Sequence, residues 1–140
     1  MEFIIPTWAL SLLVVFVTIF GAFAVQRFIA FRNASVKFRA AITAELGNIY
    51  PTPSAWPKDI DAFLRAAFPK LQASVAEFNE SLPKHKRAAF MEAWHAFHCS
   101  TGRKIDSQVY HHYMSFSSNP NPQATFHADV SRLLFLAREM

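Results

Sequence analysis

"FIIPTWALSLLVVFVTIFGAFAVQ", residues 3–26, contains no charged residue, and this stretch decides the fold class. An α-helix rises about 1.5 Å per residue, so about 20 apolar residues cross the roughly 30 Å hydrocarbon core of a bilayer. A helix in the core of a soluble protein normally carries a polar stripe, and this stretch has none. The sequence therefore predicts a transmembrane helix at about residues 3–26.

A cleaved signal peptide is the alternative interpretation, because Ala22-Phe23-Ala24 fits an A-x-A-like cleavage site. Signal peptides start with basic residues and have an apolar region of roughly 7–15 residues. Here the apolar run is longer, and Met1-Glu2 in front of it contains no basic residue. We therefore expect the helix to be retained as an uncleaved signal anchor.

Basic residues after the apolar run predict its orientation. No acidic residue lies between the run and Glu45, whereas four basic residues do: Arg27, Arg32, Lys37 and Arg39. Loops on the cytoplasmic side of a membrane are enriched in Lys and Arg. The sequence thus predicts a single-pass protein of the cell (inner) membrane with a short N-terminus outside and a cytoplasmic C-terminal domain.

The basic residues also predict a lipid partner. Besides the juxtamembrane group, the stretch "KHKR" contributes Lys84, Lys86 and Arg87 to the net charge of +4. A basic residue close to anionic headgroups gains about 1 kcal/mol. We expect both groups to be membrane-surface residues, with a solvated helix face as the alternative for residues 84–87. No nucleic-acid motif or long Lys/Arg run is present, so no nucleic-acid partner is expected.

The rest of the chain has helical periodicity. Apolar residues recur at steps of three and four as far as Leu46, which predicts one helix over about 6–46. Further helical patterns begin near 58, 83 and 123; we expect Pro69 to kink or divide the first and Ser81 to cap the second. Residues 105–116 fit a helix better than a strand.

These elements predict an all-α protein in which one N-terminal transmembrane helix continues into a small cytoplasmic helical bundle. Residues 1–46 form the transmembrane helix and its basic juxtamembrane extension. Prolines in "NIYPTPSAWP" make 47–57 a Pro-rich linker, and 58–140 form the helical domain.

"EAWHAFHCSTG", residues 92–102, contains the candidate metal ligands. On a helical wheel Glu92, His95 and Cys99 share the face opposite the apolar one, and His111 or His112 could complete a site. The spacing matches no zinc pattern, and a di-iron bundle needs two Glu-x-x-His pairs. We therefore expect no metal and no cofactor, with His95 and Cys99 as surface or interface residues of a bundle helix.

The aromatic residues predict binding rather than catalysis. The chain has 15 Phe but no Gly-rich phosphate loop and no nucleophile elbow. We expect a non-enzymatic interaction, assembly or accessory module that binds a protein partner or forms a homo-oligomer. Its predicted interaction residues are Phe28, Phe31, Phe38, Tyr50 and Trp56. The alternative is a membrane-tethered metal- or haem-binding protein that uses Glu92, His95 and Cys99 with His111 or His112.

Overall fold

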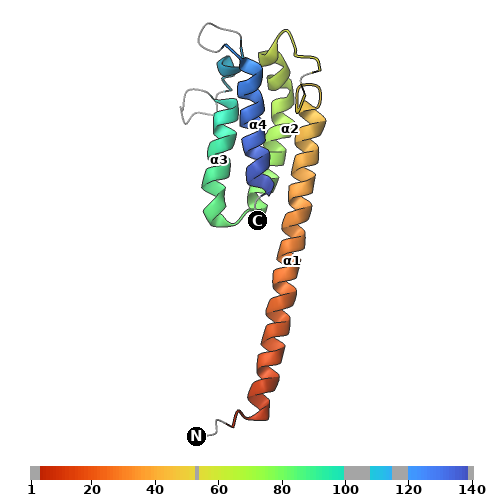
Figure 1. Ribbon diagram of the computed structural model, residues 1–140, viewed down its shortest axis with the longest axis vertical. Coiled ribbons are helices and arrows are strands. Elements are labelled where there is room, and N and C mark those ends of the chain that lie inside the picture. Colours follow the sequence, from red (N-terminus) through yellow and green to blue (C-terminus); the bar gives the residue numbers. More distant parts are fainter. Residues whose placement is uncertain (1–3, 53, 100–107, 115–119, 139–140) are drawn as a thin grey trace. The chain divides into compact units, whose positions relative to one another are not determined.

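The computed structural model describes residues 4–52, 54–99, 108–114 and 120–138. The elements in chain order are α1 (Thr7–Leu46), α2 (Ile60–Ser81), α3 (Lys84–His98), the 3-10 turn η1 (His111–Tyr113) and α4 (Pro122–Arg138) (Figure 1). The described residues contain no strand beyond an isolated parallel bridge between Cys99 and Val109. The protein is therefore all-α, as predicted, and it divides into two compact units, Met1–Asn33 and Ala34–Met140.

The first unit contains the apolar part of α1. This is the one helix in the described ranges that is long and apolar enough to cross a membrane, and no residue of its most apolar window is buried. The hydroxyls of Ser11 and Thr18 donate to the carbonyls of Thr7 and Val14, at 3.0 and 2.8 Å. These two hydroxyls are thus satisfied within the helix itself, as a lipid environment would require.

The second unit begins inside α1, earlier than the domain boundary predicted at residue 58. Phe38, Ile42 and Leu46 lie on one stripe of the helix and are buried. A stripe at steps of four residues can be covered only by packing against other helices. The C-terminal part of α1 is therefore a bundle helix.

The helix α2 begins at a polar cap and continues past its proline. The side chain of Asp59 accepts a hydrogen bond from the backbone N–H of Ala62 at 3.0 Å, which satisfies a free donor of the first turn. Pro69 lies inside the helix and does not divide it, so α2 is one helix as far as Ser81. Ser81 therefore ends α2 and does not cap α3; Pro83 is the residue before α3.

The helices α3 and α4 bury the faces that their sequences predict. On α3 these residues are Phe90, Ala93, Trp94 and Phe97, and on α4 they are Phe126, Val130, Leu133 and Ala137. Aromatic rings fill much of the core. Phe38 stacks on Phe78 with a centroid distance of 4.9 Å, and Tyr113 meets Phe126 edge-on at 5.2 Å.

Residues 108–114 do not form the helix expected over 105–116; residues 105–107 and 115–116 lie outside the described ranges. The N–H of Val109 donates to the carbonyl of His98 at 2.7 Å, and a 3-10 turn follows at 111–113. Tyr110 and Tyr113 are both buried. In a 3-10 turn, side chains three residues apart lie on the same side, so both tyrosines can enter the core from a short segment.

Candidate functional site

The candidate metal ligands of residues 92–102 do not share one face in the folded chain. α3 ends at His98, and Cys99 continues in an extended conformation that bridges to Val109. The Cys99 side chain is 3% exposed. The prediction that Cys99 is a surface or interface residue of a bundle helix is therefore wrong, because the helix ends at His98 and helical periodicity does not apply to Cys99.

The remaining candidate ligands are also separated. Glu92 is exposed and reaches Arg132 on α4, at a long 4.0 Å, while His95 is half-buried. Within the described ranges no three His, Cys, Asp or Glu side chains come together as a metal-binding group. The side chain of His111 lies outside the described residues, and His112 lies beside Asp129 instead.

A polar cluster that sequence reasoning missed links η1, α3 and α4. The Tyr113 hydroxyl lies 2.9 Å from the carbonyl oxygen of Phe97 and 2.8 Å from Oδ2 of Asp129. The imidazole Nε2 of His112 lies 3.6 Å from the same carboxylate oxygen. Tyr113 is buried and Asp129 is half-buried, so these contacts are largely shielded from water.

The protonation of this cluster follows from its geometry. A hydroxyl has one hydrogen, so Tyr113 can donate to only one of the two oxygens. Burial raises the pKa of the Asp129 carboxyl, opposed by the hydrogen bond from Tyr113 and the charges of His112 and Arg132. A protonated Asp129 would donate to Tyr113 while Tyr113 donates to Phe97, which satisfies all three groups. The cluster is thus a structural link whose carboxyl titrates at a raised pH.

One signal in the sequence pointed to this cluster. Asp129 lies on the apolar face of α4, three residues after Phe126 and next to Val130. A carboxyl group at a core position needs a hydrogen-bond partner, because burying it alone is costly. The identity of that partner depends on the packing of η1, which the local sequence does not reveal.

Most of the aromatic residues predicted to bind a partner contact other residues of the same chain instead. Phe38 contacts Phe78 and Phe90 in the core, so its assignment to an interaction surface is wrong, and Phe31 is also buried. The Tyr50 hydroxyl lies 3.1 Å from Oγ of Ser131, and the Trp56 ring meets Phe126 edge-on.

Among the described residues outside the apolar run 3–26, two Phe side chains are exposed. Phe28, a predicted interaction residue, is 54% exposed, and Phe135 on α4, which was not among the predicted residues, is 58% exposed. An isolated exposed aromatic is common, so their significance depends on the surface around them.

The predicted membrane-surface residues have different environments. Arg27, Arg32, Arg39 and Lys84 are exposed. Lys37 is exposed too and forms an ion pair with Glu77 of α2. Arg87 instead donates to the carbonyls of Leu82 and Glu80, each at 3.0 Å. The charge of Arg87 thus caps the C-terminal end of α2, where a helix dipole favours a cation.

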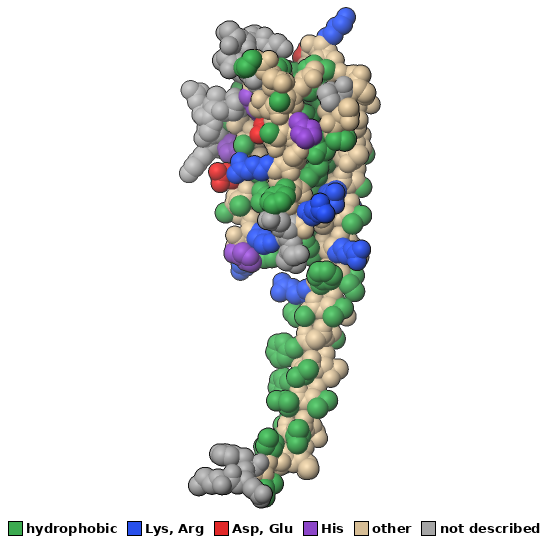
Figure 2. All heavy atoms as spheres, in the orientation of Figure 1, with side chains coloured by type: hydrophobic (Ala, Val, Ile, Leu, Met, Phe, Trp, Pro, Cys, Tyr) green, Lys and Arg blue, Asp and Glu red, His purple; other side chains and the backbone are tan. Residues whose placement is uncertain are grey.

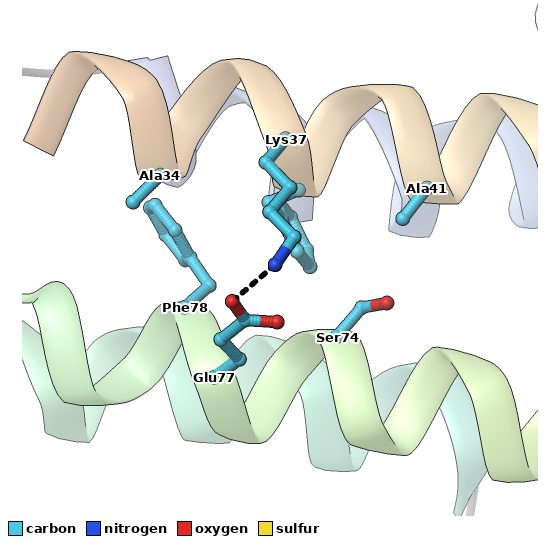
Figure 3. A pocket seen from close by; sticks show the side chains of 7 residues that line it. Ala34, Lys37, Ala41, Ser74, Glu77 and Phe78 are labelled. Atoms are coloured by element: carbon cyan, nitrogen blue, oxygen red, sulfur yellow. Dashed lines mark hydrogen bonds and ion pairs between the residues drawn. The ribbon is translucent and has the colours of Figure 1, made fainter.

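Among its described residues the second unit has a small pocket and a shallow groove. The pocket, between α1 and α2, has a volume of about 40 Å³ and is bordered by the Lys37–Glu77 ion pair (Figure 3). Small-molecule sites usually measure about 300–1,000 Å³, so this pocket has room for water molecules only. The groove is open to solvent and combines Val36, Ala40, Ala44 and Tyr50 with Leu134.

When the chain is compared with known proteins, no family model, no curated protein and no solved structure matches it.

Proposed function

We propose that the protein is a single-pass protein of the cell (inner) membrane whose helical bundle binds a protein partner or a second copy of itself. The observation that carries the proposal is α1, which is apolar and exposed through its first half and continues as one helix into a folded unit. Exposed apolar surface costs roughly 25 cal/mol per Å² in water. A bilayer removes that cost for the span.

The retained anchor and its orientation rest on the residues that flank the span. α1 is helical across Ala22–Ala24, and a protease must open the helix to reach these bonds. Arg27 and Arg32 follow the span, and the next acidic residue is Glu45. This asymmetry favours a cytoplasmic bundle and an external N-terminus.

Binding rather than catalysis is favoured by how the bundle uses its polar groups. Tyr113 and Asp129 link three elements, Arg87 caps a helix, and Cys99 is buried. The apolar groove, by contrast, is open, and Val36 at its edge is 60% exposed. Exposed apolar area of this kind is typical of protein-binding surfaces.

The anchor is tested by the intact mass and by the extraction of the full-length protein from membranes. A retained anchor gives the full mass of 15.9 kDa and resists extraction with alkaline carbonate. If the bundle is cytoplasmic, a reporter that works only in the cytoplasm should be active when fused to the C-terminus. A shorter mature chain that starts after Ala24 would show that residues 1–24 are a signal peptide.

The binding surface is tested by purification in mild detergent. We expect a constant ratio of partner to protein, or a homodimer, which Val36→Asp disrupts. Met91→Asp is the matched control, because Met91 is exposed on α3 and does not line the groove. A lone monomer that both variants leave unchanged would contradict the interaction module.

A further inference from the structure

One end of the second unit gathers the segments at which the chain enters the bundle. The Ser35 hydroxyl donates to the carbonyl of Ala137 at 2.6 Å, which brings the end of α4 to the start of the unit. The ion pair of Lys37 with Glu77 brings the last turns of α2 to the same place, and α3 starts after a short turn. We call this end the entry end, made of residues 34–38, 77–87 and 134–138 (Figure 1).

The entry end carries an excess of positive charge. Among its described residues five are cationic: Lys37, Lys84, Lys86, Arg87 and Arg138. The acidic ones are Glu77 and Glu80, and Glu139 follows in the sequence. On the face drawn in Figure 2, several Lys and Arg side chains and no acidic side chain are seen over the lowest part of the bundle, while one basic side chain stands at its upper end.

The described remainder of the second unit, which we call the opposite half, is balanced in charge. Its five cations are Arg39, Lys58, Arg65, Lys70 and Arg132, and its five acids are Glu45, Asp59, Asp61, Glu92 and Asp129. Arg65 binds Asp61 at 2.8 Å, and Lys70 lies 3.3 Å from Glu45. The positive excess is therefore a property of the entry end and not of the whole unit.

The fold itself does not account for Lys84 at this end. Lys84 is exposed in the first turn of α3, where the helix dipole disfavours a cation. The carbonyls at the end of α2 are already bound by Arg87. An external anionic surface would offset this unfavourable position of the Lys84 charge.

We infer that the entry end docks on the anionic headgroups of the bilayer that holds α1, through Lys84, Lys86 and Arg138. The inference rests on the proposed function, since it needs α1 as a retained anchor. Only eight residues of chain, 27–34, separate Gln26, at the end of the apolar run, from Ser35 at the entry end. Such a short tether keeps the cations at a high effective concentration beside the headgroups. An acidic protein would have no such tether, so the lipid surface is the favoured occupant.

The test uses the full-length protein in vesicles of phosphatidylcholine, with or without phosphatidylglycerol. An environment-sensitive fluorophore is attached at His85→Cys, and its quenching by aqueous acrylamide is measured; Cys99 is buried and is not labelled. We expect the quenching constant to fall in the anionic vesicles and to recover at high salt, because salt screens surface charge. A label at Gln123→Cys, at the other end of α4, should give the same quenching in both vesicles.

A pair of charge variants completes the test. Each basic residue near an anionic surface contributes roughly a fivefold factor to docking, so Lys84→Gln with Lys86→Gln should weaken it on the order of 25-fold. Lys58→Gln with Lys70→Gln removes the same charge from the opposite half and should leave the protection at residue 85 intact. Equal quenching in neutral and anionic vesicles would overturn the inference and leave an acidic protein as the candidate. Failure of the anchor itself is seen separately, as protein that does not float with either kind of vesicle.

Discussion

The two parts of α1 have the same secondary structure and opposite relations to their surroundings. From Thr7 to Ala30 every side chain except Ala9 is exposed, although most are apolar. After Ala34 the apolar residues Phe38, Ile42 and Leu46 are buried, and the positions between them are mostly polar or small. The helical backbone is continuous through both parts.

With α1 as the proposed membrane anchor, apolar composition and burial within the protein are separate properties, because lipid replaces water around the first part. In the first part apolar residues surround the helix, which suits a hydrocarbon environment on all sides. In the second part they occupy one stripe, which suits water on one side and protein on the other. Matched substitutions in the two parts therefore probe two different environments.

The largest expected effect is that of truncating an aromatic ring in the second part. Phe38→Ala should lower the free energy of unfolding of the bundle by about 3–5 kcal/mol, because it leaves a cavity beside Phe78 and Phe90. Chemical denaturation in mild detergent, followed by near-UV circular dichroism, measures this loss. Phe28→Ala is the control, since Phe28 is exposed and should leave the bundle's unfolding midpoint unchanged. Equal losses in the two variants would contradict the comparison.

The next effect compares two valines of similar exposure. Val17 is 64% exposed in the apolar part and Val36 is 60% exposed in the second unit. Val17→Arg should cost about 2.5–3.5 kcal/mol of insertion free energy, because it puts a charge near the middle of the span. Val36→Arg should insert normally. The fraction resistant to carbonate extraction measures the difference, and normal insertion of both variants would argue against a membrane-spanning helix.

A smaller effect is expected at the polar cluster of the second unit. Tyr113→Phe removes the hydroxyl between Asp129 and the Phe97 carbonyl and should cost about 1–3 kcal/mol of unfolding free energy. Phe135→Leu is the control, because Phe135 is exposed to solvent and its side chain has no hydrogen bond to lose. A loss no larger than that of the control would show that the cluster does not stabilise the bundle.

The same cluster predicts the sign of a pH dependence. Burial raises the pKa of Asp129 above its ordinary value of 3.8, so the folded state holds this proton more tightly than the unfolded state. Its contribution to stability is therefore largest at acid pH and falls as the pH rises from 3.8 through the raised pKa. Asp129→Asn keeps a hydrogen-bond acceptor and removes the titration. We expect the free energy of unfolding, measured as the pH rises above 3.8, to lose this downward component in the variant. If the slope of stability against pH is unchanged in the variant, the pH dependence comes from other titratable groups.

The smallest effect is expected where α1 ends. A Cβ atom added at Gly47 would lie 2.7 Å from the carbonyl oxygen of Thr43, which is backbone and cannot rotate away. Gly47→Ala should therefore lower the stability of the bundle by about 1 kcal/mol. Gly21→Ala is the matched control in the apolar part, because a Cβ atom there meets no atom within 4 Å. Thermal unfolding of both variants in detergent measures the difference.

The sequence was sufficient for features that depend on composition and local periodicity. The uncharged run predicted the long apolar helix, and its continuation to Leu46 is confirmed. The periodic spacing of Phe90, Trp94 and Phe97 predicted the buried face of α3. These features follow from the geometry of a single helix, so they can be predicted without knowing what packs against it.

The sequence was misleading where the regular pattern was extended past its end. Cys99 and the segment 108–114 were both assigned to helices, yet the two pair in an extended bridge at Val109. Pro69 was expected to interrupt a helix that continues past it. In these places contacts with other parts of the bundle override the local helix propensity of the sequence.

By itself the sequence determined that the chain is helical, which stretch is apolar enough to span a membrane, and which faces of α3 and α4 are buried. Only the tertiary structure decided that Arg87 caps α2, that Asp129 binds Tyr113, and that Phe38 belongs to the core. The physical reason is the range of the interactions. Helical periodicity repeats every 3 to 4 residues, roughly one turn, whereas a hydrogen bond or a ring contact between helices depends on how separate elements pack.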